Sequence, residues 1–502
     1  MNGETPTAKP PDTSGIGRSS SDKGMQADAG ATGLRVGMRR GLRRFGSAAA
    51  WLDRYRLEYV YLVVALIWGI LLVGVMPPLQ VPDEPAHFFR AWGLAEGVLL
   101  PTRDATENLP TNVWSLQREF PVGAIGDPSP YKGYRPGRAR ELLGQGISRE
   151  RSLEVSSVPS QNPLSYLPQA VGVLIAKATR FSPLGAMYLA RLLNLLAAVS
   201  LTFFAIRLIP FGKVILVLVA LFPVTLSEMA STSPDALTMG GAFFFLALTL
   251  WSSRKSSLSN RDMIWLLVAS VLLLHFKPGY VPLVGLILLL RPMQLASGRR
   301  YTAWVAGIVS LALFIALVLV LITPKATADV APIAGPAPLG TDSVEQIKFI
   351  VGHPIAFADA VFNTLGGAAF GYGYWMTGLL GWLTVNVSQT AVVLIFGLIL
   401  LFIGGTEEEP LVATQDRAVL LLTWAAAMAA MLASLYAGLN VVGGATVNGI
   451  QGRYLTPVFP LLLLGVYRLR FKRRHTVVLI LIVTLAIIAL WTMRAIWYHY
   501  YR

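Results

Sequence analysis

The chain alternates long apolar runs with short polar segments. We interpret eleven of these runs as membrane-spanning helices, because about 20 apolar residues rising about 1.5 Å each cross a hydrocarbon core of about 30 Å. They lie at about 59–77, 186–206, 213–230, 235–251, 263–276, 279–291, 303–323, 389–405, 417–437, 453–468 and 476–496. A weaker run at about 164–177 is ambiguous. The pattern predicts an all-α polytopic membrane protein.

Basic residues between the runs indicate which side of the membrane each loop faces, because cytoplasmic loops carry an excess of Lys and Arg. If 164–177 does not span, the basic segments fall on one side, at 35–56, 207–213, 254–261, 291–300 and 468–474. Among the short loops on the other side, only Lys277 carries a positive charge. We therefore predict an interfacial or re-entrant helix at 164–177, a cytoplasmic N-terminus and an extracytoplasmic C-terminus.

This topology divides the chain into three parts. Residues 1–57 are mostly Gly, Ala, Ser, Thr, Pro and charged residues, which predicts a disordered cytoplasmic tail followed by an uncleaved signal anchor. Residues 58–470 form the predicted transmembrane domain, and residues 471–502 add a basic loop and a C-terminal helix. Two long outside loops are expected at 78–185 and 324–388, and long loops in compact proteins are usually functional.

Composition supports the membrane class and narrows the function. Only 14% of the 502 residues are charged and 54% are hydrophobic, whereas soluble domains are about 25% charged. A net charge of +15 would indicate nucleic acid in a soluble chain, but here the basic residues flank apolar runs, where anionic lipids hold them. We expect membrane lipids and no nucleic acid as partners. The absence of cysteine excludes thiol catalysis and disulfides.

The first outside loop opens with a group of residues suited to catalysis, at 81–90. Asp83 stands where a helix N-cap belongs, and on such a helix Asp83, His87 and Arg90 share one face. Two adjacent carboxylates, Asp83 and Glu84, with a histidine nearby suit general-base catalysis or cation binding. The structural alternative is an N-cap with a solvated salt bridge.

Other ionisable and polar residues are predicted on the same outer side. Each alone has a structural explanation: Asp235 can complement a helix N-terminus, and Lys277 can reach lipid phosphates. Charges inside a bilayer cost about 2.5 kcal/mol or more, so a one-sided collection indicates a site. The residues that converge under this topology are Arg191, Asn194, Glu228, Asp235, His275, Lys277, Tyr280, Gln451, Arg453 and Tyr454.

These residue types fit a phosphorylated, lipid-borne substrate. Arg and Lys neutralise a leaving phosphate, and a carboxylate deprotonates an incoming hydroxyl. We expect Asp83 or Glu84 as the base, and Asp83, Glu84 and Asp235 as possible oxygen ligands for Mg²⁺ or Mn²⁺. The predicted catalytic residues are Asp83, Glu84 and His87, the phosphate ligands Arg191, Lys277 and Arg453, and the acceptor contacts Asp235, Tyr280, Tyr454 and Asn194.

The chain resembles the DUF2142 family of predicted bacterial membrane proteins, which is related to the GT-C glycosyltransferase fold. The resemblance extends over 59–470 and rests on PDEPAHF (82–88), NPLSYLP (162–168), RLLN (191–194), SPDAL (233–237), KPGY (277–280) and GRYLTP (452–457). It implies a GT-C-like architecture with the acidic catalytic residue and interfacial helices in the first outside loop. It also implies a polyprenyl-phosphate-linked sugar donor and inversion at the anomeric carbon. The family often has Asp after a Gly-Trp-Leu in the second outside loop, where this chain has Thr384.

The sequence thus predicts an integral membrane glycosyltransferase of the bacterial cytoplasmic membrane. It would move a sugar from a polyprenyl-phosphate donor to a glycan, lipid or protein acceptor of the cell envelope, on the extracytoplasmic face. Two alternatives stay open. A transporter or flippase of lipid-linked saccharides would hold ionisable residues at mid-membrane in an inverted repeat. A polymerase would make long glycan chains rather than single additions.

Overall fold

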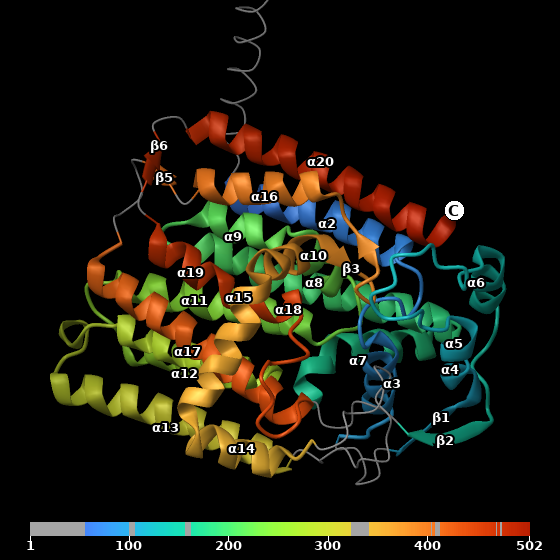
Figure 1. Ribbon diagram of the computed structural model, residues 1–502, viewed down its shortest axis with the longest axis horizontal. Coiled ribbons are helices and arrows are strands. Elements are labelled where there is room, and N and C mark those ends of the chain that lie inside the picture. The colour runs from blue at the N-terminus through green and yellow to red at the C-terminus, as the bar shows by residue number, and fades with distance from the viewer. Residues whose placement is uncertain are drawn as a thin grey trace, which may run out of the picture. The chain divides into compact units, whose positions relative to one another are not determined.

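The structure is a computed structural model that describes residues 56–99, 106–155, 162–322, 341–402, 404–406, 412–467, 469–471 and 474–502 (Figure 1). Helices dominate the described residues, and the strands there form three two-stranded pairs. This confirms the predicted all-α class. The predicted disordered tail lies outside the described residues, except for its last two positions.

Six helices are long and apolar enough to cross a membrane. A further pair, bent by 105° at its break, raises the number to seven if the two helices form one broken span. The chain is therefore a multi-pass membrane protein by helix length and composition, but eleven spans are not confirmed. The six helices are α2 (Leu57–Val75), α8 (Pro183–Leu208), α11 (Asp235–Ser253), α13 (Gly298–Ile322), α17 (Thr414–Leu439) and α20 (Arg474–Tyr501), and the bent pair is α14 (Ser343–Gly352) with α15 (Pro354–Gly378).

Five predicted spans are broken in the structure or form helices that are too short to be counted as membrane spans. Pro223, Pro282 and Pro457 lie within three of these runs, and proline lacks an amide hydrogen and clashes with the preceding helical turn. The other two runs form continuous helices of 17 and 14 residues. The resulting elements are α9 (Lys213–Ala220), α10 (Pro223–Met229), α12 (Asn260–Phe276), η2 (Pro278–Leu289), η3 (Pro292–Gln294), α16 (Gln389–Phe402), α18 (Gly452–Leu455) and α19 (Phe459–Val466).

The first predicted outside loop contains short elements rather than irregular chain. The ambiguous run forms a 3₁₀ turn and a helix of 12 residues, about 18 Å long and too short to span, as predicted. The two strands of this loop pair antiparallel. The elements are α3 (Glu84–Ala95), β1 (Thr106–Pro110), α4 (Thr111–Trp114), α5 (Leu116–Glu119), α6 (Pro136–Leu143), β2 (Arg151–Val155), η1 (Pro163–Tyr166) and α7 (Leu167–Ala178).

The second predicted outside loop is largely helical, which corrects the sequence interpretation. Its described part contains α14, α15 and a hairpin of β3 (Leu379–Leu380) with β4 (Val385–Asn386). Several glycines in α15 lower its helix propensity and interrupt the apolar pattern, so no clear helical signal is visible in this part of the sequence. A last pair, β5 (Gly404–Thr406) with β6 (Leu469–Phe471), is parallel.

Helix packing brings distant parts of the chain to one place. Helix α8 packs against α2, α7 and α11, α3 packs on α7, and α18 contacts both α10 and α15 (Figure 1). Small residues allow these close approaches. A Cβ at Gly172 would lie 2.7 Å from the Cα of Ala190, and one at Gly240 would lie 3.1 Å from the Ala198 carbonyl oxygen. The start of α3 and the start of α11 therefore meet beside α18.

Candidate functional site

Arg453, at the start of α18, lies among three carboxylates from three other elements. Its Nη2 pairs with Asp83, its Nη1 lies 3.6 Å from Glu228 Oε1, and its Nε lies 3.6 Å from Asp235 Oδ2. Nη1 also donates a hydrogen bond of 3.2 Å to the Pro82 carbonyl. Together with Lys277, which pairs with Asp235, we call this group the Arg453 cluster.

Lys277 and two tyrosines complete one side of the cluster. The Lys277 ammonium lies 2.6 Å from Asp235 Oδ1 and 4.6 Å from the centre of the Tyr454 ring, a favourable cation–π distance. The buried Tyr280 hydroxyl donates to the Tyr454 carbonyl at 2.8 Å. These contacts fix Tyr454 beside both cations, because Arg453 also lies 5.3 Å from the same ring.

Gly452 sets the position of Arg453. A Cβ at Gly452 would lie 2.2 Å from the Met376 amide nitrogen in α15, so a larger residue would push α18 away. The backbone contact therefore requires glycine directly before the arginine. The sequence motif GRYLTP included this residue, but no periodic pattern explains its role.

Asp83 is the carboxylate of the cluster that is most open to solvent. Its side chain is 35% exposed, against 9% for Asp235 and 4% for Glu228. It occupies the N-cap position of α3 with φ of 60°, yet its side chain does not cap the helix and instead pairs with Arg453. The predicted N-cap position is confirmed, but the carboxylate makes an ion pair instead of a capping hydrogen bond. Burial raises the pKa of Asp83, but Arg453 and His87 outweigh burial and hold the pKa below its usual value.

His87 lies one turn further along α3 and is buried. Its Nδ1 is 2.8 Å from the Tyr166 hydroxyl of η1. Burial lowers the pKa of His87 to about 4, so the imidazole is neutral at pH 7. A neutral ring offers a hydrogen bond but no charge, so the predicted catalytic contribution of His87 is restricted to hydrogen bonding.

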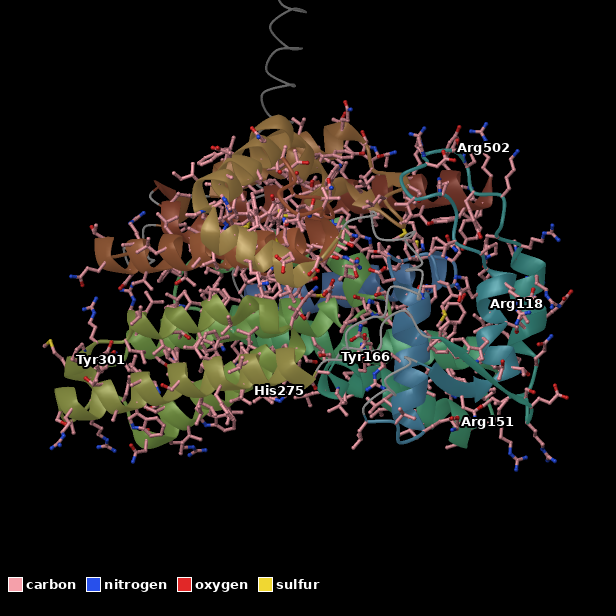
Figure 2. The ribbon with its side chains drawn as sticks, turned by 60° about the horizontal axis from the view of Figure 1, so that its bottom comes forward. Arg118, Arg151, Tyr166, His275, Tyr301 and Arg502 are labelled. Atoms are coloured by element: carbon pink, nitrogen blue, oxygen red, sulfur yellow. The ribbon has the colours of Figure 1, made fainter. Side chains whose placement is uncertain are left out.

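Tyr166 was not among the predicted site residues, although it lies in the NPLSYLP motif. Its neighbour Ser165 donates hydrogen bonds of 3.0 and 3.1 Å to the carbonyls of His275 and Phe276, at the end of α12. Figure 2 labels Tyr166 and His275 on these two contacting segments. This contact ties η1 to the segment that carries Lys277. The His275 ring itself contacts the Val271 carbonyl of its own helix, at 2.8 Å.

Glu84 and Arg191 pair with each other away from the Arg453 cluster. Arg191 Nε and Nη2 donate to the two carboxylate oxygens of Glu84 at 2.7 and 2.5 Å, and both side chains are 0% exposed. The remaining Arg191 donors bind the carbonyls of Val73, Met76 and Pro77 at the end of α2. Fully engaged and buried, Glu84 is a poor base and Arg191 a poor phosphate ligand. The pairing favours a structural role for both residues over the predicted catalytic and phosphate-binding roles.

Asn194 is buried and binds the backbone of a neighbouring turn. It is buried in α8, and its side-chain amide donates to the carbonyls of Ser231 and Ser233 at 2.8 and 2.9 Å. These carbonyls belong to the turn that leads into Asp235. Asn194 therefore holds the turn that places Asp235, which argues against the predicted acceptor contact.

A narrow void with both apolar and polar lining lies beside Arg453. Its lining includes Pro82, Glu228, Trp375, Gln451 and Arg453. Three buried atoms, Glu228 Oε2, Gln451 Oε1 and Arg453 Nε, have no hydrogen-bond partner within the described part of the chain. Buried polar groups are normally satisfied, and the void of about 10 Å³ has room for about one water, so these three atoms mark a place for an ordered water molecule.

The predicted metal ligands are not assembled. Among the described residues, no group of three or more His, Asp or Glu side chains is placed to hold a metal ion. Glu84 is engaged with Arg191, and the cations of Arg453 and Lys277 take the carboxylates of Asp83 and Asp235.

The depressed pKa of His87 makes the stability of the fold depend on pH. The unfolded chain takes up the proton near pH 6.5 and the folded chain only near pH 4. The buried neutral imidazole therefore makes its full contribution to the free energy of unfolding above pH 6.5, and this contribution is lost as the pH falls through 4. We expect the thermal unfolding midpoint to fall over this interval, and to fall less in His87→Gln. The exposed His353→Gln serves as a control with the wild-type slope, and equal slopes in all three proteins would contradict the assignment.

Comparison with known proteins gives one family. A family model described as predicted membrane protein (DUF2142) matches residues 66–462, which include every member of the Arg453 cluster. No curated protein and no solved structure matches the chain.

Proposed function

The chain belongs to the DUF2142 family of predicted membrane proteins, and from that premise and the Arg453 cluster we propose an integral membrane glycosyltransferase that uses a polyprenyl-phosphate-linked sugar. One observation carries the proposal: a partly exposed carboxylate, Asp83, is paired with a buried arginine, Arg453, whose Nε lacks a hydrogen-bond partner among the described residues. A general base and a phosphate ligand are thus adjacent, as a glycosyl transfer from a phosphate requires.

The charge balance of the cluster favours a phosphate that changes the ion pairs. Three carboxylates share two cations, Arg453 and Lys277, when all are ionised. A phosphate that approaches from the exposed side of Asp83 competes with this carboxylate for Arg453, because a guanidinium binds carboxylate and phosphate with the same geometry. When Arg453 turns to the phosphate, Asp83 loses the partner that weakens it as a base. Donor binding thereby activates the base.

These residues can accept the proton and neutralise the leaving group of the sugar transfer. The acceptor hydroxyl oxygen bonds to the anomeric carbon as the bond from that carbon to the phosphate oxygen breaks. The hydroxyl proton goes to Asp83, and the bonding electron pair goes to the polyprenyl phosphate, whose charge Arg453 and Lys277 neutralise. Attack opposite the leaving group inverts the anomeric carbon. His87 contributes a neutral hydrogen-bonding group beside Asp83.

An apolar cavity supports a lipid-linked donor. It measures about 420 Å³ and its lining includes Met376, Phe396, Trp424, Met428, Leu455 and Phe459. Leu455 lies in the same helical turn as Arg453, so a chain in this cavity starts close to the phosphate position. The unsaturated tail of a polyprenyl phosphate suits aromatic and methionine side chains, which pack against irregular apolar shapes.

The proposal is tested with the purified full-length chain in lipid nanodiscs. A panel of polyprenyl-phosphate hexoses is supplied with a cell-envelope extract as acceptor source, and released polyprenyl phosphate and transferred sugar are measured. Transfer with stoichiometric release supports the proposal. Alternating labelling of Ser227→Cys from both sides of the membrane, without any transfer, would favour the flippase instead.

Lys277 offers a matched comparison for phosphate binding. Lys277 and Lys255 each pair with an aspartate at 2.6 Å and lie over an aromatic ring, but only Lys277 belongs to the cluster. We expect Lys277→Met to weaken inhibition by polyprenyl phosphate about tenfold or more, since a charge-assisted contact contributes about 1.5–3 kcal/mol. Lys255→Met is expected to match the wild type. Equal inhibition constants for both variants and the wild type would contradict the phosphate role.

The activation of Asp83 by the donor predicts two different pH profiles. In the free protein the pKa of Asp83 lies below its ordinary 3.8, so Asp83 stays deprotonated above that pH. Protonation of Asp83 should therefore not lower kcat/KM above pH 3.8. In the donor complex Arg453 binds phosphate, the pKa of Asp83 rises, and kcat should decline at a higher pH than kcat/KM. Initial rates from pH 4 upward measure both curves. Coincident acidic limbs would contradict the exchange of partners.

A further inference from the structure

A second polar pocket lies across one wall from the Arg453 cluster. The wall includes the turn between β3 and β4, where Gly381 and Leu383 line the void beside Arg453 whereas Trp382 and Thr384 line the second pocket. Gln80 lines the second pocket in the same way, two residues before Pro82, which lines the first. The two spaces are thus adjacent.

The turn that forms this wall depends on its backbone conformation. Gly381 has φ of 61° and Leu383 has φ of 60°. A Cβ at Gly381 would lie 2.7 Å from the Tyr500 hydroxyl oxygen, so no other residue fits there without a shift. These dihedrals let successive side chains face opposite sides of the wall.

The inner side chains of the second pocket are fixed by contacts from separate segments. The Trp382 indole nitrogen donates to the Leu79 carbonyl at 3.1 Å, and Gln80 Nε2 donates to the Pro121 carbonyl at 3.2 Å. The Tyr131 amide donates to the His499 carbonyl at 2.7 Å, which joins the outside loop to the end of α20. Such preorganisation is typical of a binding pocket rather than of a surface hollow.

The lining chemistry is that of a carbohydrate site. Trp382, Tyr131 and His499 supply rings for the C–H faces of a sugar, and Gln80 supplies an amide. At the exposed rim, the Asp127 carboxylate adds a negatively charged hydrogen-bond acceptor and the Lys132 ammonium adds positively charged donors. The balance of charges disfavours a phosphate or nucleotide. A volume of about 220 Å³, below the roughly 300 Å³ of drug-sized pockets, suits one sugar ring.

We propose that this pocket binds a sugar unit of the acceptor, and that the acceptor of the transfer is therefore a carbohydrate. The inference rests on the proposed function, which supplies the donor side of the wall. The segment from Gln80 to Asp83 passes from the second pocket to the base, so a glycan held at Gln80 extends along the chain toward Asp83. Water-exposed rim residues allow a glycan to enter without crossing lipid.

Binding of simple sugars tests this inference without turnover. Saturation-transfer NMR is recorded on the full-length protein in nanodiscs with a panel of methyl glycosides of neutral and N-acetylated hexoses. We expect a saturation-transfer signal from at least one glycoside. In the double variant Asp127→Ala with Lys132→Ala, the dissociation constant should rise about tenfold or more, equivalent to about 1.4 kcal/mol. Glu345→Ala with Lys348→Ala removes another exposed acid–base pair, on α14, and should leave binding unchanged.

The outcomes separate the inference from the proposed function. The acceptor pocket is overturned if no glycoside gives a saturation-transfer signal, or if the Asp127 and Lys132 double variant binds glycosides as tightly as the wild type. Asp83→Asn lies on the other side of the wall and should keep sugar binding while it loses turnover. If turnover depends on Asp83 but no sugar binds at the second pocket, the glycosyltransferase proposal stands and the carbohydrate acceptor falls.

Discussion

Asp83→Asn is expected to lower turnover of a polyprenyl-phosphate sugar by about 10²–10⁴-fold, the usual contribution of a general base. Asparagine keeps the shape of the side chain and can still accept a hydrogen bond from Arg453, but it cannot take up the acceptor proton. The loss should therefore appear in kcat, with KM for the donor little changed. Initial rates at saturating donor, with the thermal unfolding midpoint measured alongside, separate lost chemistry from lost fold.

Glu84→Gln is the matched comparison, because the sequence left Asp83 and Glu84 as alternative bases. The Glu84 carboxylate is buried against Arg191, so its replacement should lower stability while the protein that stays folded keeps its turnover per molecule. The reverse result, a stable Asp83→Asn variant with full turnover and an inactive but stable Glu84→Gln variant, would move the base to Glu84 and contradict the site.

The sequence predicted the membrane class and most helix positions, because apolar length and spacing depend on local physics alone. It overcounted spans where proline interrupts an apolar run, as at Pro223 and Pro457. It also missed α15, because glycine-rich helices stabilised by tertiary packing carry little local signal. Periodicity reports what a segment prefers, whereas α15 is held by its contacts with α10, α14 and α18.

The sequence grouped several residues of the Arg453 cluster on one side of the membrane but did not predict which of them pair. Sidedness alone brought Asp83, Asp235, Lys277 and Arg453 into one predicted group, and the structure joins all four by ion pairs. Two cations at the outer ends of spans look alike in a sequence. Only packing shows that Arg191 is enclosed at the end of α2, whereas Arg453 lies beside a narrow void.

This difference between the two arginines gives them different roles on physical grounds. An arginine whose donors all meet carbonyls and one carboxylate fixes the backbone around it, and at 0% exposure it has no free face for a ligand. The Glu84–Arg191 pair joins α3 to α2 and α8 directly next to Asp83. The pair therefore ties the start of α3 to the end of α2, whereas Arg453 holds the Asp83 side chain directly.

Arg191→Met is accordingly expected to destabilise the fold strongly, by about 3–5 kcal/mol, because it leaves the Glu84 charge buried without a partner. The additional Glu84→Gln change should restore part of this loss, since no unpaired charge then remains. Restoration stays partial, because the carbonyls of Val73, Met76 and Pro77 have still lost their donor. Unfolding of the nanodisc-extracted protein in a denaturing detergent titration measures all three proteins.

Arg138 supplies the control for this experiment. It makes the same two-pronged contact with Glu119, at 2.8 and 2.6 Å, but its side chain is 39% exposed. Because exposed ion pairs contribute little, Arg138→Met should unfold almost like the wild type. If Arg191→Met also unfolded like the wild type and lost only donor affinity, Arg191 would act on the phosphate as the sequence predicted. Buried geometry and satisfied donors make loss of folding the expected result.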